Sequence, residues 1–401
     1  WSERLSHPDF QRVAIVGAGA IGGWLGVLLS HTGCIVSALA RGDTLAALQR
    51  EGLQLHENGR LIGAPVEASS SAVALGVQDL VIVAVKAPAL ADVARSIAPL
   101  IGRHTMVLTA MNGVPWWFFN GFGGERAGTR LQSVDPTGAI DRAIPARNVI
   151  GGVVHASCSV DAPGVIRHHF GNGLIIGEPS GEASERVSAL AELLRRAGLN
   201  ASVSPQIQKD VWYKLWGNMT VNPVSALTGA TTDRILGDPD LRAMVSAVML
   251  EARAVGEKIG LPIEQEPEDR HAVTAKLGAF KTSMLQDVEA GRPVELDALL
   301  GAVIELGQLT TTAMPFTRAL AARVFALFGE GVPLQSVCTL LDLSLQDVWR
   351  YRYALDTGRA GGAEPVARST EPAPAPPAPR RSPRHARLSA SLARRRRTRA
   401  G

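Results

Sequence analysis

A strand pattern that runs directly into a glycine-rich turn constrains the fold more than any other feature of this sequence. Residues 13–22 read VAIVGAGAIG, and an apolar helical pattern follows. Gly17 allows a sharp turn, Gly19 lets the backbone approach a pyrophosphate, and Gly22 lets the helix pack closely on the strand. The helix N-terminus would then hold phosphates through its free N–H groups and partial positive charge. We therefore predict a dinucleotide-binding turn rather than a purely structural one, made by Gly17, Ala18, Gly19, Ala20, Ile21 and Gly22.

The first half of the chain alternates strand and helix patterns. Strands are expected at 12–16, 34–40, 80–85 and 106–110, and shorter ones, forming an antiparallel extension, at 150–159, 164–170 and 174–177. A helix is expected over 184–197, with Gly198 as its C-terminal cap. Alternating strands and helices predict a parallel sheet with helices on both faces. Residues 11–203 are therefore predicted to form a Rossmann-type, doubly wound α/β domain.

Helical periodicity dominates after residue 204. Helices are expected at 210–218, 239–259, 271–290 with a break before Ser283, and 294–311. We predict a second, all-helical domain over 204–333. Residues 334–355 are apolar enough to fold but are not assigned. From residue 361 the chain is rich in Ala, Pro and Arg, so the end of the 334–401 segment is predicted to be disordered and without function, although it could tether acidic partners.

The charge is unevenly distributed. The net charge is +4, but residues 380–401 hold nine arginines and no acids, and subtracting these leaves −5 for residues 1–379. Nucleic-acid binding by the folded part therefore has no electrostatic support. Cys34, Cys158 and Cys338 form no C-x-x-C pair, so we expect neither disulfides nor a metal site. With no membrane-span pattern and no signal-peptide core, a cytoplasmic protein is expected.

The end of the second predicted strand bears on the choice of nicotinamide cofactor. NAD-specific folds usually carry Asp or Glu there, to bind the ribose 2′-hydroxyl. This sequence has Arg41, with Asp43 slightly beyond. A guanidinium suits a 2′-phosphate, so the sequence favours NADPH. The alternative is that Arg41 is a solvated loop charge and that Asp43 caps the following helix.

Several polar residues follow strands or share a helix face, and each is ambiguous alone. Lys86 follows a predicted strand, so it is either a surface charge or a ligand of phosphate or substrate. Asn112-Gly113 is either a simple turn or a source of an amide for nicotinamide or substrate. The aromatic run 116–119 is expected to pack between domains rather than to form a substrate wall.

A second group lies in the helical half. Lys214, Asn218 and Asn222 are spaced i, i+4, i+8, which places them on one helix face. This stripe is either solvated or holds a lysine that protonates a carbonyl, with amides that orient the substrate. Ser283 is, by itself, an early helix residue or a cap, and Glu295 is a favourable acid in a first helical turn.

Together these segments resemble the ketopantoate reductase family over about residues 12–330. The resemblance rests on the glycine turn, on Lys86 and Asn112-Gly113, and on two more specific motifs: K-x-x-x-N-x-x-x-N-P from Lys214, and S-M-L-Q-D from Ser283 with Glu295 twelve residues later. The resemblance implies that a small 2-keto acid, ketopantoate, is reduced by NADPH. The resemblance is compatible with a homodimer but does not decide the oligomeric state.

The resemblance also implies roles for individual residues. Lys214 would donate the proton to the substrate carbonyl, and Asn218, Asn222 and Ser283 would bind substrate. Lys86 and Asn112 would lie at the nicotinamide end of the cofactor, with Asn112 also near the substrate. Glu295 would lie near cofactor and lysine, and Ser157 would belong to a His-Ala-x loop near the cofactor, here His155-Ala156-Ser157.

One departure from the family pattern concerns substrate recognition. A further asparagine expected ten residues after Asn222 is replaced by Thr232. Reduction of another 2-keto acid, and NADP binding without catalysis, are therefore kept as alternatives. A third alternative is an NAD-dependent β-hydroxy acid dehydrogenase, which Arg41 disfavours.

Overall fold

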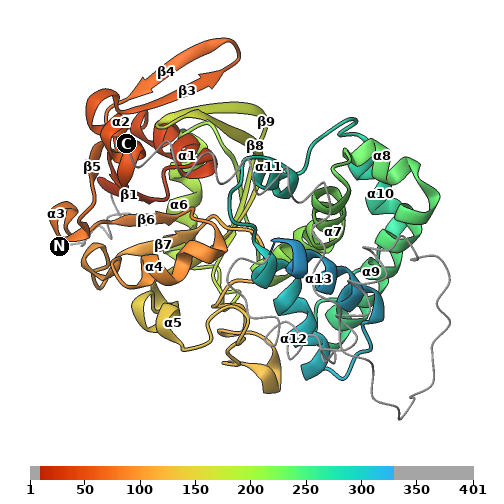
Figure 1. Cartoon of the computed structure of the whole chain (residues 1–401). Helices are drawn as coiled ribbons and strands as arrows, with labels where there is room; N and C mark the ends of the chain where they lie inside the picture. The colour runs from red at the N-terminus through yellow and green to blue at the C-terminus, as the bar shows by residue number, and fades with distance from the viewer. Residues whose placement is uncertain (1–9, 329–401) are drawn as a thin grey trace, which may run out of the picture. The chain divides into compact units, whose positions relative to one another are not determined.

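A ten-stranded mixed sheet organises the first part of the structure, a computed structural model that describes residues 10–328 (Figure 1). Its central strands are all parallel and run in the order β5-β2-β1-β6-β7-β8. The first five of these are short and lie at Arg12–Val16 (β1), Ile35–Leu39 (β2), Glu67–Ser69 (β5), Leu80–Val83 (β6) and Met106–Thr109 (β7).

The strand order reverses at β1. This strand pairs with β2 on one side and with β6 on the other. The chain therefore leaves β1 towards one edge and later returns to its other side. In doubly wound sheets, the crevice at the carboxyl ends of two such strands is where ligands bind. The predicted glycine turn begins at the end of β1, at this crevice.

A long hairpin extends the sheet. β8 (Val149–Ala162) runs antiparallel to β9 (Val165–Gly177), with register shifts near His155 and Val160. β10 (Asn200–Val203) and the hairpin of β3 (Leu53–Glu57) with β4 (Arg60–Ala64) complete the sheet beside β9. The predicted antiparallel extension is confirmed, but the strands expected at 164–170 and 174–177 are one continuous strand.

Four strands were missed by the sequence patterns, namely β3, β4, β5 and β10. They are three to five residues long, and their residues are largely exposed or half-buried. A strand that buries few side chains carries little hydrophobic alternation, so its signal is weak. The parallel strands β1, β2, β6 and β7 lie within one or two residues of their predicted ends, because most of their residues are buried.

Six α-helices accompany the sheet. α6 shows why the sequence specifies their ends: Ser184 accepts a hydrogen bond from the Val187 N–H at its start, and Gly198 follows its end with a φ of 88°. The six helices are α1 (Ala20–Ser30), α2 (Gly42–Glu51), α3 (Ala72–Leu75), α4 (Leu90–Ala94), α5 (Ala139–Ala143) and α6 (Glu185–Arg196).

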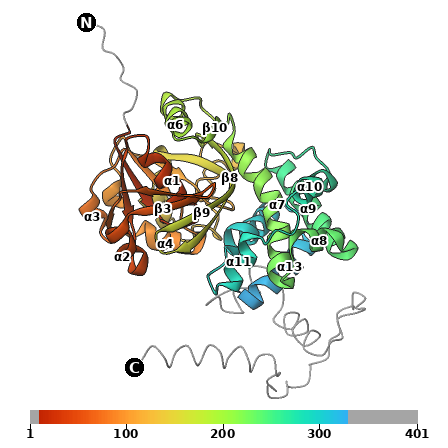
Figure 2. The ribbon, with the colours of Figure 1, turned by 90° about the horizontal axis from the view of Figure 1, so that it is seen from above.

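The chain is helical from α7 onward, as predicted. α7 leads away from the hairpin into the helical region (Figure 2). The elements are α7 (Ile207–Thr228), α8 (Thr232–Gly237), α9 (Pro239–Lys258), α10 (Pro267–Ala275), α11 (Ser283–Glu289), a π-helical turn (Asp297–Gly301), α12 (Ala302–Leu309) and α13 (Pro315–Phe328). The predicted break before Ser283 is confirmed. The helix expected at 210–218 is far longer and continues through Pro223.

Two hydrophobic clusters divide the interior. One lies against α1 and α6, on one face of the sheet. The other begins on the opposite face with Val81 and Val107 and continues without a break into α7, α9 and α12. The aromatic run 116–119 is buried at this junction, where Phe118 lies 6.4 Å from Trp212 between ring centroids. The domain boundary at residue 203 remains a prediction. The boundary at residue 333 and the segment 334–401 lie outside the described residues.

Candidate active site

The glycine turn has the local geometry that a bound pyrophosphate would need. Gly17 has a φ of 97°, which favours glycine, and a Cβ at Gly22 would lie only 2.1 Å from the carbonyl oxygen of Gly17. A Cβ at Gly19, by contrast, would meet nothing within 4 Å. Gly19 is also the N-cap of α1, with no side chain capping the helix. The turn is therefore tightly packed on the protein side and open at Gly19, where phosphates would bind.

Arg41 lies where the sequence predicted, between β2 and α2. It is exposed and forms the N-cap position of α2, with an extended backbone. Asp43 lies in the first turn of α2 rather than at the cap. Within residues 10–328 no carboxylate forms an ion pair with Arg41. Its guanidinium is therefore available to an external anion at the crevice.

Lys86 extends from the carboxyl end of β6 to the helical region. Its ammonium forms an ion pair with Asp287 of α11, whose side chain is 6% exposed. Asp287 also accepts a hydrogen bond from Arg292 Nε at 3.0 Å. The sequence motif S-M-L-Q-D includes Asp287, but no role was predicted for it. Its partner lies about two hundred residues earlier in the chain, so local spacing carried no signal.

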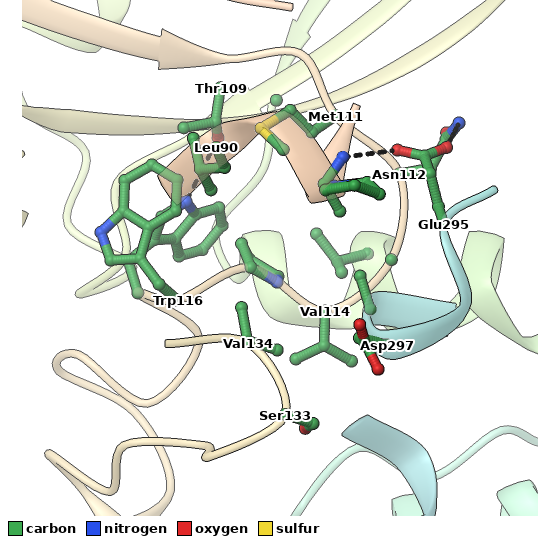
Figure 3. A pocket seen from close by; sticks show the side chains of 18 of the residues that line it. Leu90, Thr109, Met111, Asn112, Val114, Trp116, Ser133, Val134, Glu295 and Asp297 are labelled. Atoms are coloured by element: carbon green, nitrogen blue, oxygen red, sulfur yellow. Dashed lines mark hydrogen bonds between the residues drawn. The ribbon is translucent and has the colours of Figure 1, made fainter. Parts of the chain in front are cut away.

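Glu295 joins the two halves of the site. One carboxylate oxygen accepts a hydrogen bond from the Ala87 N–H at 3.2 Å, and the other accepts one from Asn112 Nδ2 at 3.4 Å (Figure 3). The side chain is buried, and this burial raises its pKa, while the Ala87 N–H, Lys86 and Asn112 oppose the rise. Glu295 thus holds the segments after β6 and β7 against the start of the helix that contains the π-helical turn.

Lys214 points from α7 to the hairpin. Its Nζ donates a hydrogen bond to the Val154 carbonyl of β8 at 2.7 Å. Burial lowers the pKa of Lys214 to about 8, Glu295 opposes this shift, and Arg270 adds to it. Tertiary packing thus places an ammonium that releases its proton more readily than an ordinary lysine where sheet and helices meet.

Asn218 and Asn222 continue along the same helix face as Lys214. Both are half-buried, and among residues 10–328 neither side-chain amide has a hydrogen-bond partner within the protein. Two unpaired amides in line with a buried lysine are suited to a polar ligand. The interpretation as a fully solvated face does not describe this stripe, because Lys214 is bonded to the hairpin and not to solvent alone.

Two further predicted site residues, Ser283 and Ser157, lie on α11 and β8, and Ser283 is an early helix residue rather than the cap. Ser283 is exposed and is the first residue of α11, while Thr282 is its cap and accepts a hydrogen bond from the Leu285 N–H. Ser157 lies within β8, in agreement with the strand predicted at 150–159 and not with the loop implied by the resemblance, and it stands at an irregularity of the β8–β9 pairing. α11 packs on α7, the helix that carries Lys214.

A cavity of about 210 Å³ opens beside Asn112 and Glu295. Its walls are largely apolar, with Ser133 and Asp297 as further polar members (Figure 3). Trp116 and Trp117 line it, so half of the aromatic run contributes to a pocket wall while Phe118 and Phe119 pack in the interior. The prediction that this run only packs between domains is therefore incomplete.

In the described part of the chain, no group of three or more His, Cys, Asp or Glu side chains is arranged to hold a metal ion. Over the same residues, no helix combines the length and apolarity needed to cross a bilayer.

The fold and the site together are those of an NAD(P)H-dependent oxidoreductase with a helical second region. The family profile "Ketopantoate reductase PanE/ApbA" matches residues 13–181, and "Ketopantoate reductase PanE/ApbA C terminal" matches residues 206–327. The chain is 49% identical over 320 residues to a 2-dehydropantoate 2-reductase of Mesorhizobium japonicum, covering 80% of this chain and 98% of the relative. This protein belongs to the ketopantoate reductase family, and a keto-acid substrate is implied by that family.

Solved structures agree with this assignment. A protein from Ralstonia solanacearum MolK2, assigned as a ketopantoate reductase, has a TM-score of 0.78 and 54% identity, covering 81% of this chain and 99% of that one. A D-mandelate dehydrogenase bound to NADH and anilino(oxo)acetate has a TM-score of 0.67 and 23% identity, covering 79% and 97%. The second likeness shows only that the fold is shared.

Proposed function

We propose that this protein reduces 2-dehydropantoate to pantoate, with NADPH as the hydride donor and Lys214 as the proton donor. The observation that carries the proposal is the position of Lys214, whose half-buried side chain is bonded to the hairpin through Nζ. The 49% identity to a 2-dehydropantoate 2-reductase over most of the chain supports this substrate.

The glycine turn, Arg41, Lys86, Asn112, Ser157 and Glu295 would hold the cofactor. Gly19 leaves room for the pyrophosphate, and Arg41 offers a charge for the 2′-phosphate that distinguishes NADPH from NADH. When bound, the nicotinamide supplies the hydride that reduces the keto carbon. The ends of β6 and β7, where Lys86 and Asn112 lie, form the crevice that receives the nicotinamide in this type of sheet.

Lys214 stabilises the charge that develops on the substrate oxygen. As the keto carbon is reduced, negative charge accumulates on that oxygen, and a nearby ammonium stabilises it more strongly than it stabilises the neutral carbonyl. The Nζ then transfers its proton to the oxygen. Burial brings the pKa of Lys214 to about 8, so the group is charged at neutral pH and still gives up its proton readily.

The two asparagines and Ser283 orient the substrate. Asn218 and Asn222 present unpaired amides along the face of α7 that holds Lys214, and Ser283 presents an exposed hydroxyl at the start of α11. These groups can bind the hydroxyl and carboxylate oxygens of a small hydroxylated keto acid. Reduction of a different 2-keto acid is the second candidate, because Thr232 replaces the expected asparagine and an apolar cavity lies beside Asn112.

The decisive experiment is a substrate panel. Purified protein is given NADPH with 2-dehydropantoate, or with straight-chain, branched and aromatic 2-keto acids, and NADPH oxidation is followed. The proposal expects the highest kcat/KM with 2-dehydropantoate. A preference for another acid supports the second candidate, and NADPH binding without turnover on any acid refutes catalysis.

A substitution at Lys214, with a matched control on the same helix, tests whether this residue is the proton donor. Lys214→Met keeps the length of the side chain but removes its proton, so turnover should fall by roughly 10²–10⁴-fold while NADPH affinity is kept. Lys209→Met, on an exposed position at the start of the same helix, serves as the control and should retain full turnover. Normal turnover by Lys214→Met would refute the proton-donor assignment.

A further inference from the structure

Arg270 is a cation beside the site to which the sequence assigned no role. It lies on α10, and its guanidinium carbon is 5.3 Å from the centroid of the Tyr213 ring on α7. Its Nε is fully buried and has no hydrogen-bond partner. Within residues 10–328 no carboxylate lies at ion-pair distance from it. A buried donor without a partner is costly, so this one is a candidate for a ligand.

The backbone of α7 is shaped to admit this guanidinium. A Cβ at Gly217 would lie 2.6 Å from Arg270 Nε, so only glycine leaves the space that the side chain occupies. Gly217 is one turn after Tyr213, and the ring and the glycine thus form one surface beneath the guanidinium. The start of α10 is held by a reciprocal capping box between Glu266 and Asp269. The position of Arg270 is therefore built into both helices.

The charge of Arg270 reaches groups on both sides of the site. It contributes to lowering the pKa of Lys214 on α7 and that of His155 on β8, after burial in each case. Two other arginines of the helical region are neutralised: Arg242 pairs with Glu268, and Arg253 pairs with Glu266. Arg270 instead adds a second positive charge beside Lys214. An anion bound between these two cations would relieve their repulsion.

We propose that Arg270 is a substrate-binding residue, and that its guanidinium binds the carboxylate of the 2-keto acid while Lys214 faces the adjacent carbonyl. This inference rests on the proposed function, because it assigns the carboxylate of that same substrate to a named group. A guanidinium binds a carboxylate through two parallel hydrogen bonds, which orients the acid as well as attracting it. Tyr213 and Gly217 restrict the position of this guanidinium on α7.

The test compares Arg270→Gln and Arg270→Lys with the wild type. A lost charge-assisted hydrogen bond should raise KM for the keto acid by about 10- to 100-fold, with kcat changed far less and NADPH affinity unchanged. Arg270→Lys keeps the positive charge but loses the paired N–H donors of the guanidinium. Its KM for the keto acid should therefore lie between that of the wild type and that of Arg270→Gln. Arg234→Gln, at an exposed position of α8, is the control and should leave KM unchanged.

Two further measurements separate this inference from the proposed function. The 2-keto amide of the same acid carries no carboxylate, so wild type should prefer acid to amide and Arg270→Gln should lose that preference. Oxamate binding to the NADP⁺-loaded protein, measured by calorimetry, reports on anion binding without turnover and should weaken in Arg270→Gln. Wild-type activity with an unchanged KM in Arg270→Gln would overturn the inference but leave the function intact. Wild type without activity would refute the function, and oxamate would still test the anion site.

Discussion

Two alanine substitutions in the glycine turn should differ in their effect on stability. At Gly22 an added Cβ would lie 2.1 Å from the Gly17 carbonyl oxygen, 3.0 Å from Ile15 Cγ2 and 3.1 Å from Ala84 Cβ. At Gly19 the same atom would meet nothing within 4 Å, and the backbone φ of −86° is accessible to alanine. Gly22→Ala should therefore lower the stability of the folded protein, whereas Gly19→Ala should weaken only the binding of NADPH.

The geometry sets the size of each effect. The obstructing atom at Gly22 is a backbone oxygen, so the start of α1 must move away from β1 by about 1 Å to restore ordinary contact. Overpacking of this kind costs about 1–3 kcal/mol of the free energy of unfolding. In a chain of 401 residues, that should lower Tm by about 1–4 °C. Gly19→Ala should change the free energy of unfolding by less than about 0.5 kcal/mol.

Thermal unfolding and NADPH titration distinguish the two variants. Gly22→Ala should have a lower Tm and bind NADPH poorly, because the turn has moved. Gly19→Ala should keep the wild-type Tm, but its Kd for NADPH should rise about tenfold or more, which corresponds to about 1.4 kcal/mol of lost contact. A wild-type Tm for Gly22→Ala would refute the close packing of α1 on β1. Wild-type NADPH affinity for Gly19→Ala would refute the pyrophosphate site.

The remaining predictions concern charge. Lys214 must be protonated to donate, and its pKa is about 8, so the rate of reduction should fall as pH rises above about 8 in a pH–kcat profile. Glu295→Gln removes the carboxylate that raises the pKa of Lys214, so the rate of reduction should begin to fall at a lower pH than in the wild type. An unchanged pH–kcat profile would mean that Glu295 carries no charge beside Lys214. Arg41→Ala should weaken NADPH binding but not NADH binding, as measured by separate titrations, and an unchanged preference would exclude Arg41 from cofactor choice.

Local chemistry explains which parts of the fold the sequence predicted. Most residues of β1, β2, β6 and β7 are buried, so they stand out as apolar runs, and the glycine turn is recognisable because each glycine meets a separate steric demand. β3 and β4 form no continuous apolar run, because β3 buries only two of its five side chains fully and β4 is largely exposed. The length of α7 was underestimated because Pro223 normally ends a helix, and here tertiary packing outweighs that preference.

The sequence by itself determined the alternation of buried parallel strands with helices, the glycine turn after β1 and the spacing of Lys214, Asn218 and Asn222, because these depend on neighbours close in the chain. Only the tertiary structure brought Ala87 and Asn112 to the carboxylate of Glu295, and Arg270 to the face of α7. It also decided the acidity of Lys214, because a pKa depends on burial and on charges that come from distant parts of the chain.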